Sequence, residues 1–264
     1  MNGRALLRRL AGLLYGAVLI AIFAFLTAPV FVVTTISFSN ESFISFPPAR
    51  WGWRAYEQLL KDETWLQPLL RSLELATSVG VLSTIIGVIA VLGIRRTRLR
   101  GAALWEFVGL GPLVAPGVAY AVALYAFYSS IHLLGTFLGI VLAHTVLALP
   151  FVLLIVGAAM TRVPRQLELA AQSLGAGRIE AWLQITLPML APAVIASFVF
   201  SFITSFDEAV VANFVGDIGF VTLPVQMFDS VRFGVEPVIA AVSTSLLAFT
   251  ALFGLLYGYA RGRA

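Results

Sequence analysis

The sequence predicts an all-α integral membrane protein, and three observations lead to this fold class. Of its 264 residues, 60% are hydrophobic and only 11% are charged. The mean hydropathy is +0.96, which lies outside the range of ordinary soluble domains. Uncharged runs also recur along the chain, each close to the ~20 residues that a helix needs to cross a hydrocarbon core of about 30 Å.

Six such runs predict six membrane-spanning helices in a single transmembrane domain, residues 1–264. Because the bilayer core offers no water to backbone amides, each run is expected to be helical even where a proline interrupts it. Pro116, Pro150 and Pro192 therefore predict kinks in the third, fourth and fifth spans. The spans are predicted at residues 11–36, 75–94, 107–128, 137–159, 189–206 and 237–260.

The arginines predict how these spans are oriented. The first run follows three arginines, as the core of a signal peptide does, but it is longer than the usual 7 to 15 residues and is interpreted as a retained span. Twelve of the seventeen basic residues fall on one side, which is predicted to be cytoplasmic together with both termini. They are Arg4, Arg8, Arg9, Arg95, Arg96, Arg98, Arg100, Arg162, Arg165, Arg178, Arg261 and Arg263. The net positive charge follows from this topology, so no nucleic-acid partner is predicted.

The residues that the chain lacks restrict its chemistry. It has no cysteine, which excludes disulfides and thiolate ligands. Its two histidines, His132 and His144, have no carboxylate-rich surroundings, so no metal site is predicted, and His144 is interpreted as a polar residue on a packed helix. No glycine-rich phosphate loop precedes Lys61, the only lysine. The chain is therefore expected to bind no cofactor, and ATP and Mg²⁺ would be bound by another subunit.

The loop between the fourth and fifth spans, residues 160–188, is long enough to have its own structure. Pro164 is expected in the first turn of a helix whose apolar face has the spacing i, i+3, i+4, i+7, with Glu168 and Gln172 pointing away from it. That face consists of Leu167, Ala170, Ala171 and Leu174. Gly175 and Gly177 are expected to end this helix.

A second short helix is predicted to follow, with Ile179, Trp182 and Leu183 on one side, before Leu187 and Pro188 turn the chain into the fifth span. The pattern allows two interpretations. The paired helices form a rigid knob suited to a groove in a partner, or they form an amphipathic helix that rests on lipid headgroups. The pattern alone favours neither.

At these residues the chain resembles the permease subunits of binding-protein-dependent ABC importers. Their cytoplasmic signature is Glu-Ala-Ala, three residues, Gly, nine residues, Ile, any residue, Leu-Pro. The matching residues here are Leu169, Ala170, Ala171, Gly175, Ile185, Leu187 and Pro188, and every spacing agrees. The one departure is Leu169 in place of the glutamate, with Glu168 one position earlier.

The resemblance implies a fold like that of type I ABC importer permeases, in the bacterial inner (cytoplasmic) membrane. It implies that the loop couples to a cytoplasmic ATPase dimer, through Leu167 and Glu168 as well as the signature residues. It also implies two further partners besides the lipid bilayer: a second, homologous permease chain that completes a heterodimer, and a periplasmic substrate-binding protein.

Further residues resemble the polyamine (spermidine/putrescine) branch of these permeases. They are Arg71-Ser72-Leu73, Ser205-Phe206-Asp207-Glu208, Thr222-Leu223-Pro224, Val231-Arg232-Phe233 and residues 240–244. The cargo implied is a polyamine or a related small amine, although the branch also carries opines, phosphonates and iron chelates.

Two alternatives come from other functional classes. One is an ion-coupled secondary transporter, which should show acidic residues at mid-membrane. The other is a membrane-embedded enzyme, which needs clustered catalytic groups. The sequence shows neither clearly.

Two further features each have a functional and a structural interpretation. Asp207 and Glu208 come near the predicted outer end of the fifth span, where they would either end a helix or line the translocation path and its gate. The outer segment 43–70 is rich in tryptophan and tyrosine. Such rings either anchor a chain at the membrane interface or, with the loop 213–236, form the surface on which the substrate-binding protein docks.

Overall fold

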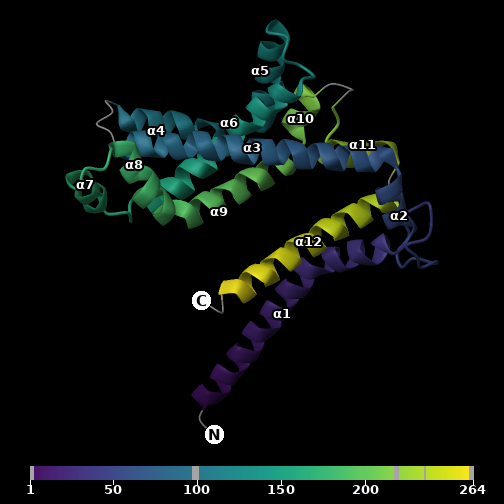
Figure 1. Ribbon diagram of the computed structural model, residues 1–264. Coiled ribbons are helices and arrows are strands. Elements are labelled where there is room, and N and C mark those ends of the chain that lie inside the picture. The colour runs from purple at the N-terminus through teal and green to yellow at the C-terminus, as the bar shows by residue number, and fades with distance from the viewer. Residues whose placement is uncertain (1–2, 97–100, 217–219, 235, 262–264) are drawn as a thin grey trace. The chain divides into compact units, whose positions relative to one another are not determined.

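The computed structural model describes residues 3–96, 101–216, 220–234 and 236–261, without the side chains of residues 3–10, 233 and 253–261. Arg98, Arg100 and Arg263, which entered the prediction of orientation, lie outside these residues. Among the described residues every regular element is helical, apart from one isolated bridge between Ser39 and Trp51. The chain divides into two compact units, one comprising Met1–Leu66 and Asp229–Ala264 and the other Gln67–Phe228 (Figure 1).

The first unit is built on two long apolar helices. Helix α1 (Gly3–Ser37) packs beside α12 (Pro237–Arg261), and the short helix α2 (Arg54–Lys61) also packs against α12 (Figure 1). Most side chains of α1 between residues 11 and 31 are exposed, although nearly all are apolar. A surface of this kind is suited to lipid or to a neighbouring membrane subunit.

The segment between α1 and α2 is ordered by a pair of backbone hydrogen bonds and an aromatic cluster. The Asn40 amide donates to the Arg50 carbonyl and the Gly52 amide to the Phe38 carbonyl, both at 2.8 Å. The rings of Phe38, Trp53 and Tyr56 lie with their centroids 5.0 to 5.4 Å apart. Trp53 nevertheless remains 63% exposed, so part of this aromatic surface is available for contact with lipid or protein.

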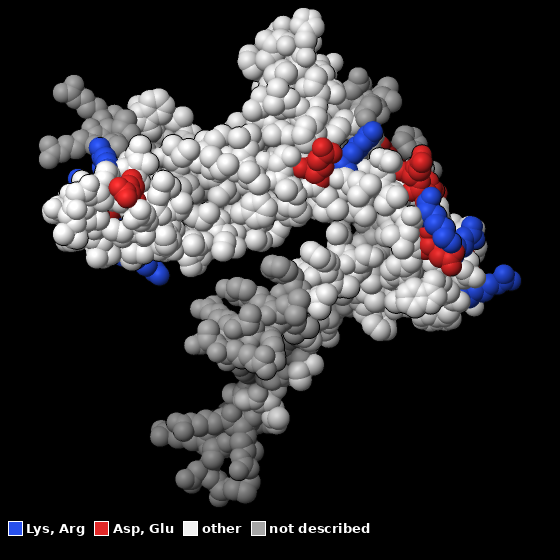
Figure 2. All heavy atoms as spheres, viewed as in Figure 1, with Lys and Arg blue, Asp and Glu red and all other residues white. Residues whose placement is uncertain are grey.

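The second unit contains α3 (Glu63–Arg96) from Gln67 onward, with α6 (Phe137–Met160), α9 (Leu187–Phe206) and the shorter helices α5 (Gly117–Ser130) and α10 (Val210–Val215). Its first apolar cluster joins α3, α5, α6 and α10, and its second joins α3, α6 and α9 next to the loop that follows α6. The amide of Leu223, which begins α11 (Leu223–Phe233), donates to Ser72 Oγ of α3 at 2.7 Å. On the face in Figure 2, uncharged side chains cover the middle of this unit and charges gather toward its ends.

Four helical stretches are long and apolar enough to cross a membrane: Ala11–Ser37, Glu63–Arg96, Phe137–Met160 and Arg178–Phe206. They match the first, second, fourth and fifth predicted spans. The described apolar part of α12, Pro237–Leu252, is shorter. The number of six spans and the orientation of the termini therefore stay predictions.

The third predicted span differs from a single kinked helix. Helix α4 (Ala102–Leu110) with the 3-10 turn η1 (Gly111–Leu113) meets α5 at 101°. Pro112 and Pro116 each lack a backbone N–H, so no regular helix continues through this stretch. Pro150 and Pro192, by contrast, lie within the uninterrupted helices α6 and α9.

Candidate functional site

The loop between α6 and α9 is a folded element that begins with helix α7 (Arg165–Ser173). Pro164 immediately precedes α7 with extended backbone angles, φ −66° and ψ 124°, so it is the capping residue and not part of the first turn as predicted. Both positions suit proline, because the first amides of a helix have no partner within it.

Helix α7 ends as predicted at Gly175. The φ of Gly175 is +99°, a left-handed conformation that glycine adopts without a steric penalty. The Ala176 amide then donates to the Ala171 carbonyl and the Gly175 amide to the Gln172 carbonyl, both at 3.0 Å, which is the Schellman arrangement. Gly177 differs from the prediction, since it begins α8 (Arg178–Ala181), and its amide donates to the Glu180 carboxylate at 3.3 Å.

The chain enters the fifth span as one continuous helix from Arg178 to Phe206, so the predicted turn at Leu187 and Pro188 is absent. Between α8 and α9 lies one π-helical stretch, η2 (Trp182–Thr186), where the Leu187 amide donates to the Trp182 carbonyl. Pro188 explains it: without an N–H, proline cannot donate to the carbonyl four residues earlier, and a widened turn accommodates the gap.

The apolar side chains of this loop point away from the chain. Leu167 is 42% exposed, Leu169 49% and Leu174 89%. In the following stretch Ile179 is 69% exposed and Leu183 57%. A surface helix of a globular protein usually buries such residues against the core of that protein. Here they form an outward surface, called below the outward apolar face, which needs either lipid or a partner protein to cover it.

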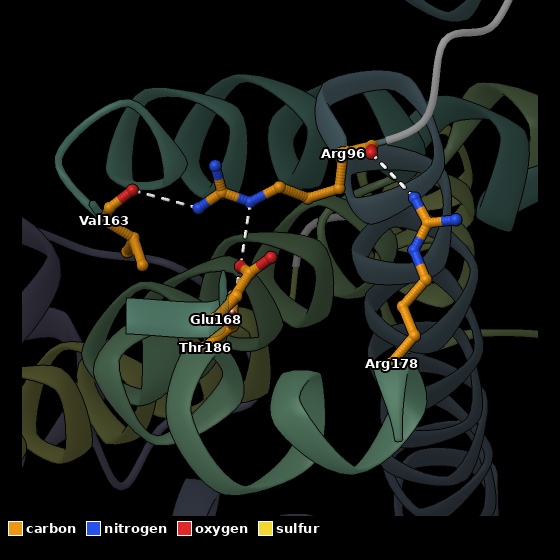
Figure 3. Close-up of polar contacts among 5 residues, drawn as sticks. All are labelled: Arg96, Val163, Glu168, Arg178 and Thr186. Atoms are coloured by element: carbon orange, nitrogen blue, oxygen red, sulfur yellow. Dashed lines mark hydrogen bonds and ion pairs between the residues drawn. The ribbon is translucent and has the colours of Figure 1, made fainter. Parts of the chain in front are cut away.

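Glu168 points in the opposite direction and is the one buried residue of α7. Its Oε1 atom lies 2.9 Å from Nε of Arg96, the last residue of α3, and the two side chains are only 4% and 9% exposed. Thr186 Oγ1, from η2, donates to the same oxygen at 2.5 Å. These three side chains, called below the Arg96–Glu168–Thr186 cluster, join three elements at one point (Figure 3).

Two further hydrogen bonds hold Arg96 in place. Its Nη2 atom donates to the Val163 carbonyl at 2.9 Å, and Val163 itself is buried in the second apolar cluster. Arg178 Nη2 donates to the Arg96 carbonyl at 2.8 Å (Figure 3). The Arg178 guanidinium also lies 5.2 Å from the ring centre of Trp182. The C-terminal end of α3 is therefore fastened to both helices of the loop.

The other signature residues lie on or near this loop with differing exposure. Ala170 and Pro188 are exposed, Ala171 and Ile185 are half-buried, and Leu187 packs against the second apolar cluster. The spacing of the signature thus corresponds to one folded unit, with Gly175 closing its first helix.

Asp207 and Glu208 lie at the other end of α9. Asp207 is the residue that follows the last turn of α9, and its amide donates to the Ile203 carbonyl at 3.0 Å. The Glu208 carboxylate accepts the Val211 amide at 2.8 Å, which caps the start of α10. Glu208 thus has a structural role at a helix end.

His144 is buried, as predicted for a polar residue on a packed helix. Its Nδ1 atom lies 3.0 Å from Oγ of Ser205, which is also buried and lies about one turn before the two carboxylates.

Sequence reasoning missed Arg96 and Thr186 as site residues. Arg96 was one of four arginines after the second span, and nothing in the spacing distinguished it from its neighbours. Thr186 occupies a signature position that accepts any residue. The sequence feature that could have indicated these partners was Glu168, because a carboxylate opposite an apolar face needs a partner if that side of the helix packs.

Among the described residues, no group of three or more His, Cys, Asp or Glu side chains could hold a metal ion.

Comparisons with known proteins agree with this arrangement. The family described as "Binding-protein-dependent transport system inner membrane component" matches residues 5–263. The putrescine transport system permease protein PotI of Escherichia coli is 33% identical over 92% of this chain and 88% of its own length. The spermidine/putrescine transport system permease protein PotC of Haemophilus influenzae is 28% identical over 90% of this chain and 92% of its own.

A solved structure shows the same fold. A chain of a bacterial ABC transporter involved in the import of the acidic polysaccharide alginate superimposes with a TM-score of 0.73 at 16% identity. The match covers 98% of this chain and 99% of the other. An identity this low supports the fold and leaves the cargo to other evidence.

Proposed function

Because the chain belongs to the family of binding-protein-dependent transport system inner membrane components, we propose that it imports a polyamine or a related small amine into the cytoplasm. The chain is a membrane permease subunit of an ABC importer and not an enzyme, and the ATPase is a separate chain. We place it in the bacterial inner membrane, as a multi-pass protein that binds no cofactor of its own. ATP and Mg²⁺ would bind to the ATPase.

The amine cargo is supported by the names of two relatives that match nearly the whole chain, one for putrescine and one for spermidine and putrescine. The alternatives within this class are an opine, a phosphonate or an iron chelate. An ion-coupled secondary transporter and a membrane-embedded enzyme do not fit the family. Binding of labelled putrescine and spermidine to the cognate receptor, followed by uptake into proteoliposomes that contain the complete importer, tests the cargo. Uptake of neither amine would refute putrescine and spermidine as the cargo.

The outward apolar face is the observation that supports docking of the loop on an ATPase. A surface of several exposed apolar side chains is typical of a site that lipid or a partner protein covers, and the family is one in which the ATPase is a separate chain. The coupling residues we propose are those of the signature with their two neighbours. They are Leu167, Glu168, Leu169, Ala170, Ala171, Gly175, Ile185, Leu187 and Pro188. A second, homologous permease chain would complete the membrane part.

An Ala171→Asp variant tests this docking. The new carboxylate would lie beside the outward apolar face, and a buried charge without a partner is strongly unfavourable at an interface. We expect the variant to lose the ATPase during co-purification and to lose uptake. Ala171→Ser adds a small polar group without a charge at the same half-buried position and should retain both. Full assembly and uptake in Ala171→Asp would refute docking through this face and favour contact with lipid headgroups.

Asp207 and Glu208 remain candidates for the translocation path or its gate. Glu208 also caps α10, so the two variants have different expected effects. Asp207→Asn removes a charge without removing a known hydrogen bond of its side chain, whereas Glu208→Gln keeps an oxygen that can still accept the Val211 amide. Normal uptake rates in both variants, at normal expression, would exclude these carboxylates from the mechanism.

The outer aromatic segment is a candidate surface for the substrate-binding protein. Trp51 and Trp53 are each 63% exposed. The backbone of Trp51 pairs with that of Ser39, and the ring of Trp53 packs against the ring of Phe38. Photo-crosslinkers at these two positions should capture the purified receptor in the assembled importer. Crosslinks to lipid alone would instead identify the segment as a membrane-interface anchor.

A further inference from the structure

The Arg96–Glu168–Thr186 cluster needs a reason beyond stability. Both charged side chains lose nearly all of their hydration, and that cost can exceed the attraction between the charges. A well-packed apolar pair of similar size is often equally stable or more stable. Hydrogen bonds do differ from apolar packing in direction, and those from Thr186 to Glu168 and from Arg96 Nη2 to the Val163 carbonyl are satisfied in only one relative arrangement of the segments that they join.

The rest of the loop offers few alternative attachments. Of the residues between Thr161 and Gln184, only Val163, Glu168 and Ala181 are buried. Val163 lies just before α7 and Ala181 in α8, so within α7 itself Glu168 is the sole buried contact with the rest of the chain. A displacement applied to α7 is therefore passed to α3 and to the fifth span through this carboxylate, in addition to the chain connections at its two ends.

The geometry also indicates which helices would receive that displacement. Glu168 Oε1 contacts Arg96 at the C-terminal end of α3 and Thr186 at the start of the fifth span, at 2.9 and 2.5 Å. Both contacts involve the same oxygen, so while both contacts are made, α7, the end of α3 and the start of the fifth span keep one relative arrangement. The hydrogen bond from Arg178 to the Arg96 carbonyl adds a second connection between α3 and the loop.

We propose that Arg96, Glu168 and Thr186 are positioning residues for energy coupling, which hold α7, the end of α3 and the start of the fifth span as one rigid body. This proposal rests on the proposed docking of the loop on an ATPase. It also explains the departure from the signature. The signature has a glutamate at the position of Leu169, and in this chain the glutamate stands one residue earlier, as Glu168. Its carboxylate contacts Arg96 and Thr186 of the same chain. Leu169, which occupies the signature position, is exposed and belongs to the outward apolar face.

A distance measurement tests the rigid body directly and needs no knowledge of the cargo. The chain has no cysteine, so Ile89→Cys on α3 and Ser173→Cys on α7, both exposed, provide two unique positions for spin labels. In importers whose partner chains lack cysteine, we expect the distance between the labels to be the same without nucleotide and after trapping with ATP and vanadate. With Glu168→Gln added, the distance should change between the two states or its distribution should broaden.

Transport measurements provide the second readout. In proteoliposomes supplied with putrescine and its receptor, Glu168→Gln should raise the ATP hydrolysed per putrescine imported by about 10-fold, while the ATPase stays in the complex. Thr186→Val removes one hydrogen bond and keeps the side-chain volume, so it should raise the ratio of ATP hydrolysed to putrescine imported by a smaller factor. This variant replaces Glu168→Gln in the measurement if the Glu168→Gln importer does not assemble. Glu180→Gln, an exposed carboxylate of the same loop, is the matched control and should leave the ratio unchanged.

Two results would overturn the proposal. One is a label distance that changes on nucleotide trapping in the unsubstituted cluster as much as in Glu168→Gln. The other is a normal ratio of ATP to putrescine in the variant complexes, even at a reduced yield, because a purely stabilising role would lower the yield alone. Failure of the docking proposal is recognised separately, since Ala171→Asp importers would then keep their ATPase and their uptake.

Discussion

Gly87 of α3 allows an approach to α6 that no other residue would permit. A Cβ atom at this position would lie 2.4 Å from Cγ1 of Val152, far inside van der Waals contact. Val152 is fully buried and β-branched, so its side chain cannot rotate away cheaply. Close backbone approach through small residues is a general means of packing helices in membranes. The two helices therefore fix each other's position at this level.

We predict that Gly87→Ala lowers the stability of the importer by about 1–3 kcal/mol, because the helices must separate to admit the methyl group. The measurement is the midpoint of thermal unfolding of the detergent-purified complex. Gly157→Ala is the matched control, since a Cβ there meets nothing within 4 Å. Equal midpoints for the two variants would show that α3 and α6 have freedom to move apart.

A second glycine acts through its backbone. Gly175 has a φ of +99°, so Gly175→Ala should raise the free energy of the loop's conformation by about 1–2 kcal/mol. We expect uptake to fall several-fold, because the Schellman closure of α7 is disturbed. Gly177→Ala keeps an ordinary φ of −62° with free space around its Cβ, and should transport normally. The opposite ranking of the two variants would contradict the assignment of Gly175 as the end of α7.

At the scale of an element, the π turn η2 sets the rotation of Thr186 toward Glu168. Proline causes this turn through its missing N–H, so Pro188→Ala supplies the missing donor and permits a regular helix. A regular helix would rotate Thr186 relative to the preceding residues and weaken its contact with Glu168.

We predict that Pro188→Ala leaves the thermal stability unchanged or raised, because alanine is a far better helix former than proline, while uptake falls. The measurement is uptake and thermal midpoint on the same preparation. Pro192→Ala, one turn further along α9 and outside η2, is the control and should not reduce uptake in this way. Undiminished uptake in Pro188→Ala would show that the widened turn has no role in transport.

The same elements show what the sequence could and could not predict. Uncharged runs predicted most of the long helices, since hydrocarbon burial depends on composition over a whole segment. The sharp break between α4 and α5 was expected only as a kink, because proline indicates that regular hydrogen bonding stops and does not set the angle that follows. The turn expected at Pro188 was wrong for a related reason, since a π turn accommodated the proline within one helix.

For the whole molecule, the contact of Arg96 with Glu168 constrains the membrane topology. Arg96 ends α3, and Glu168 follows α6, so these two points lie on the same side of the membrane. The chain between them must cross the bilayer an even number of times. Helix α6 is long and apolar enough for one crossing, so we predict that the bent pair formed by α4 and α5 provides another. A re-entrant loop at this position would place the two charges on opposite sides.

Single-cysteine labelling tests this topology in the cysteine-free chain. Ser130→Cys, exposed at the end of α5, should react with an impermeant thiol reagent added outside intact cells or spheroplasts. Ser173→Cys on α7 should react only after the membrane is permeabilised, because its side is predicted to be cytoplasmic. Reaction of both positions from the same side would contradict the crossing by α4 and α5.

The candidate site was predictable in its spacing and not in its contacts. Gly175 followed from local rules of helix ends, and Leu167, Leu174, Ile179 and Leu183 followed from helix periodicity, whereas Leu169 was not expected on the outward apolar face. The partners of Glu168 did not, since Arg96 is 72 positions earlier in the chain and is brought near only by the packing of α3 against α6. Contacts of this range depend on the tertiary arrangement, which one sequence does not reveal.

The exposed leucines of α7 and the stretch after it also have a consequence for the cell. If the loop docks on an ATPase as proposed, a chain synthesised without that ATPase would expose these apolar side chains to the cytosol, where chaperones and quality-control proteases bind such surfaces. Orphan subunits should therefore be degraded, and the abundance of this permease should follow the supply of the protein that covers its loop.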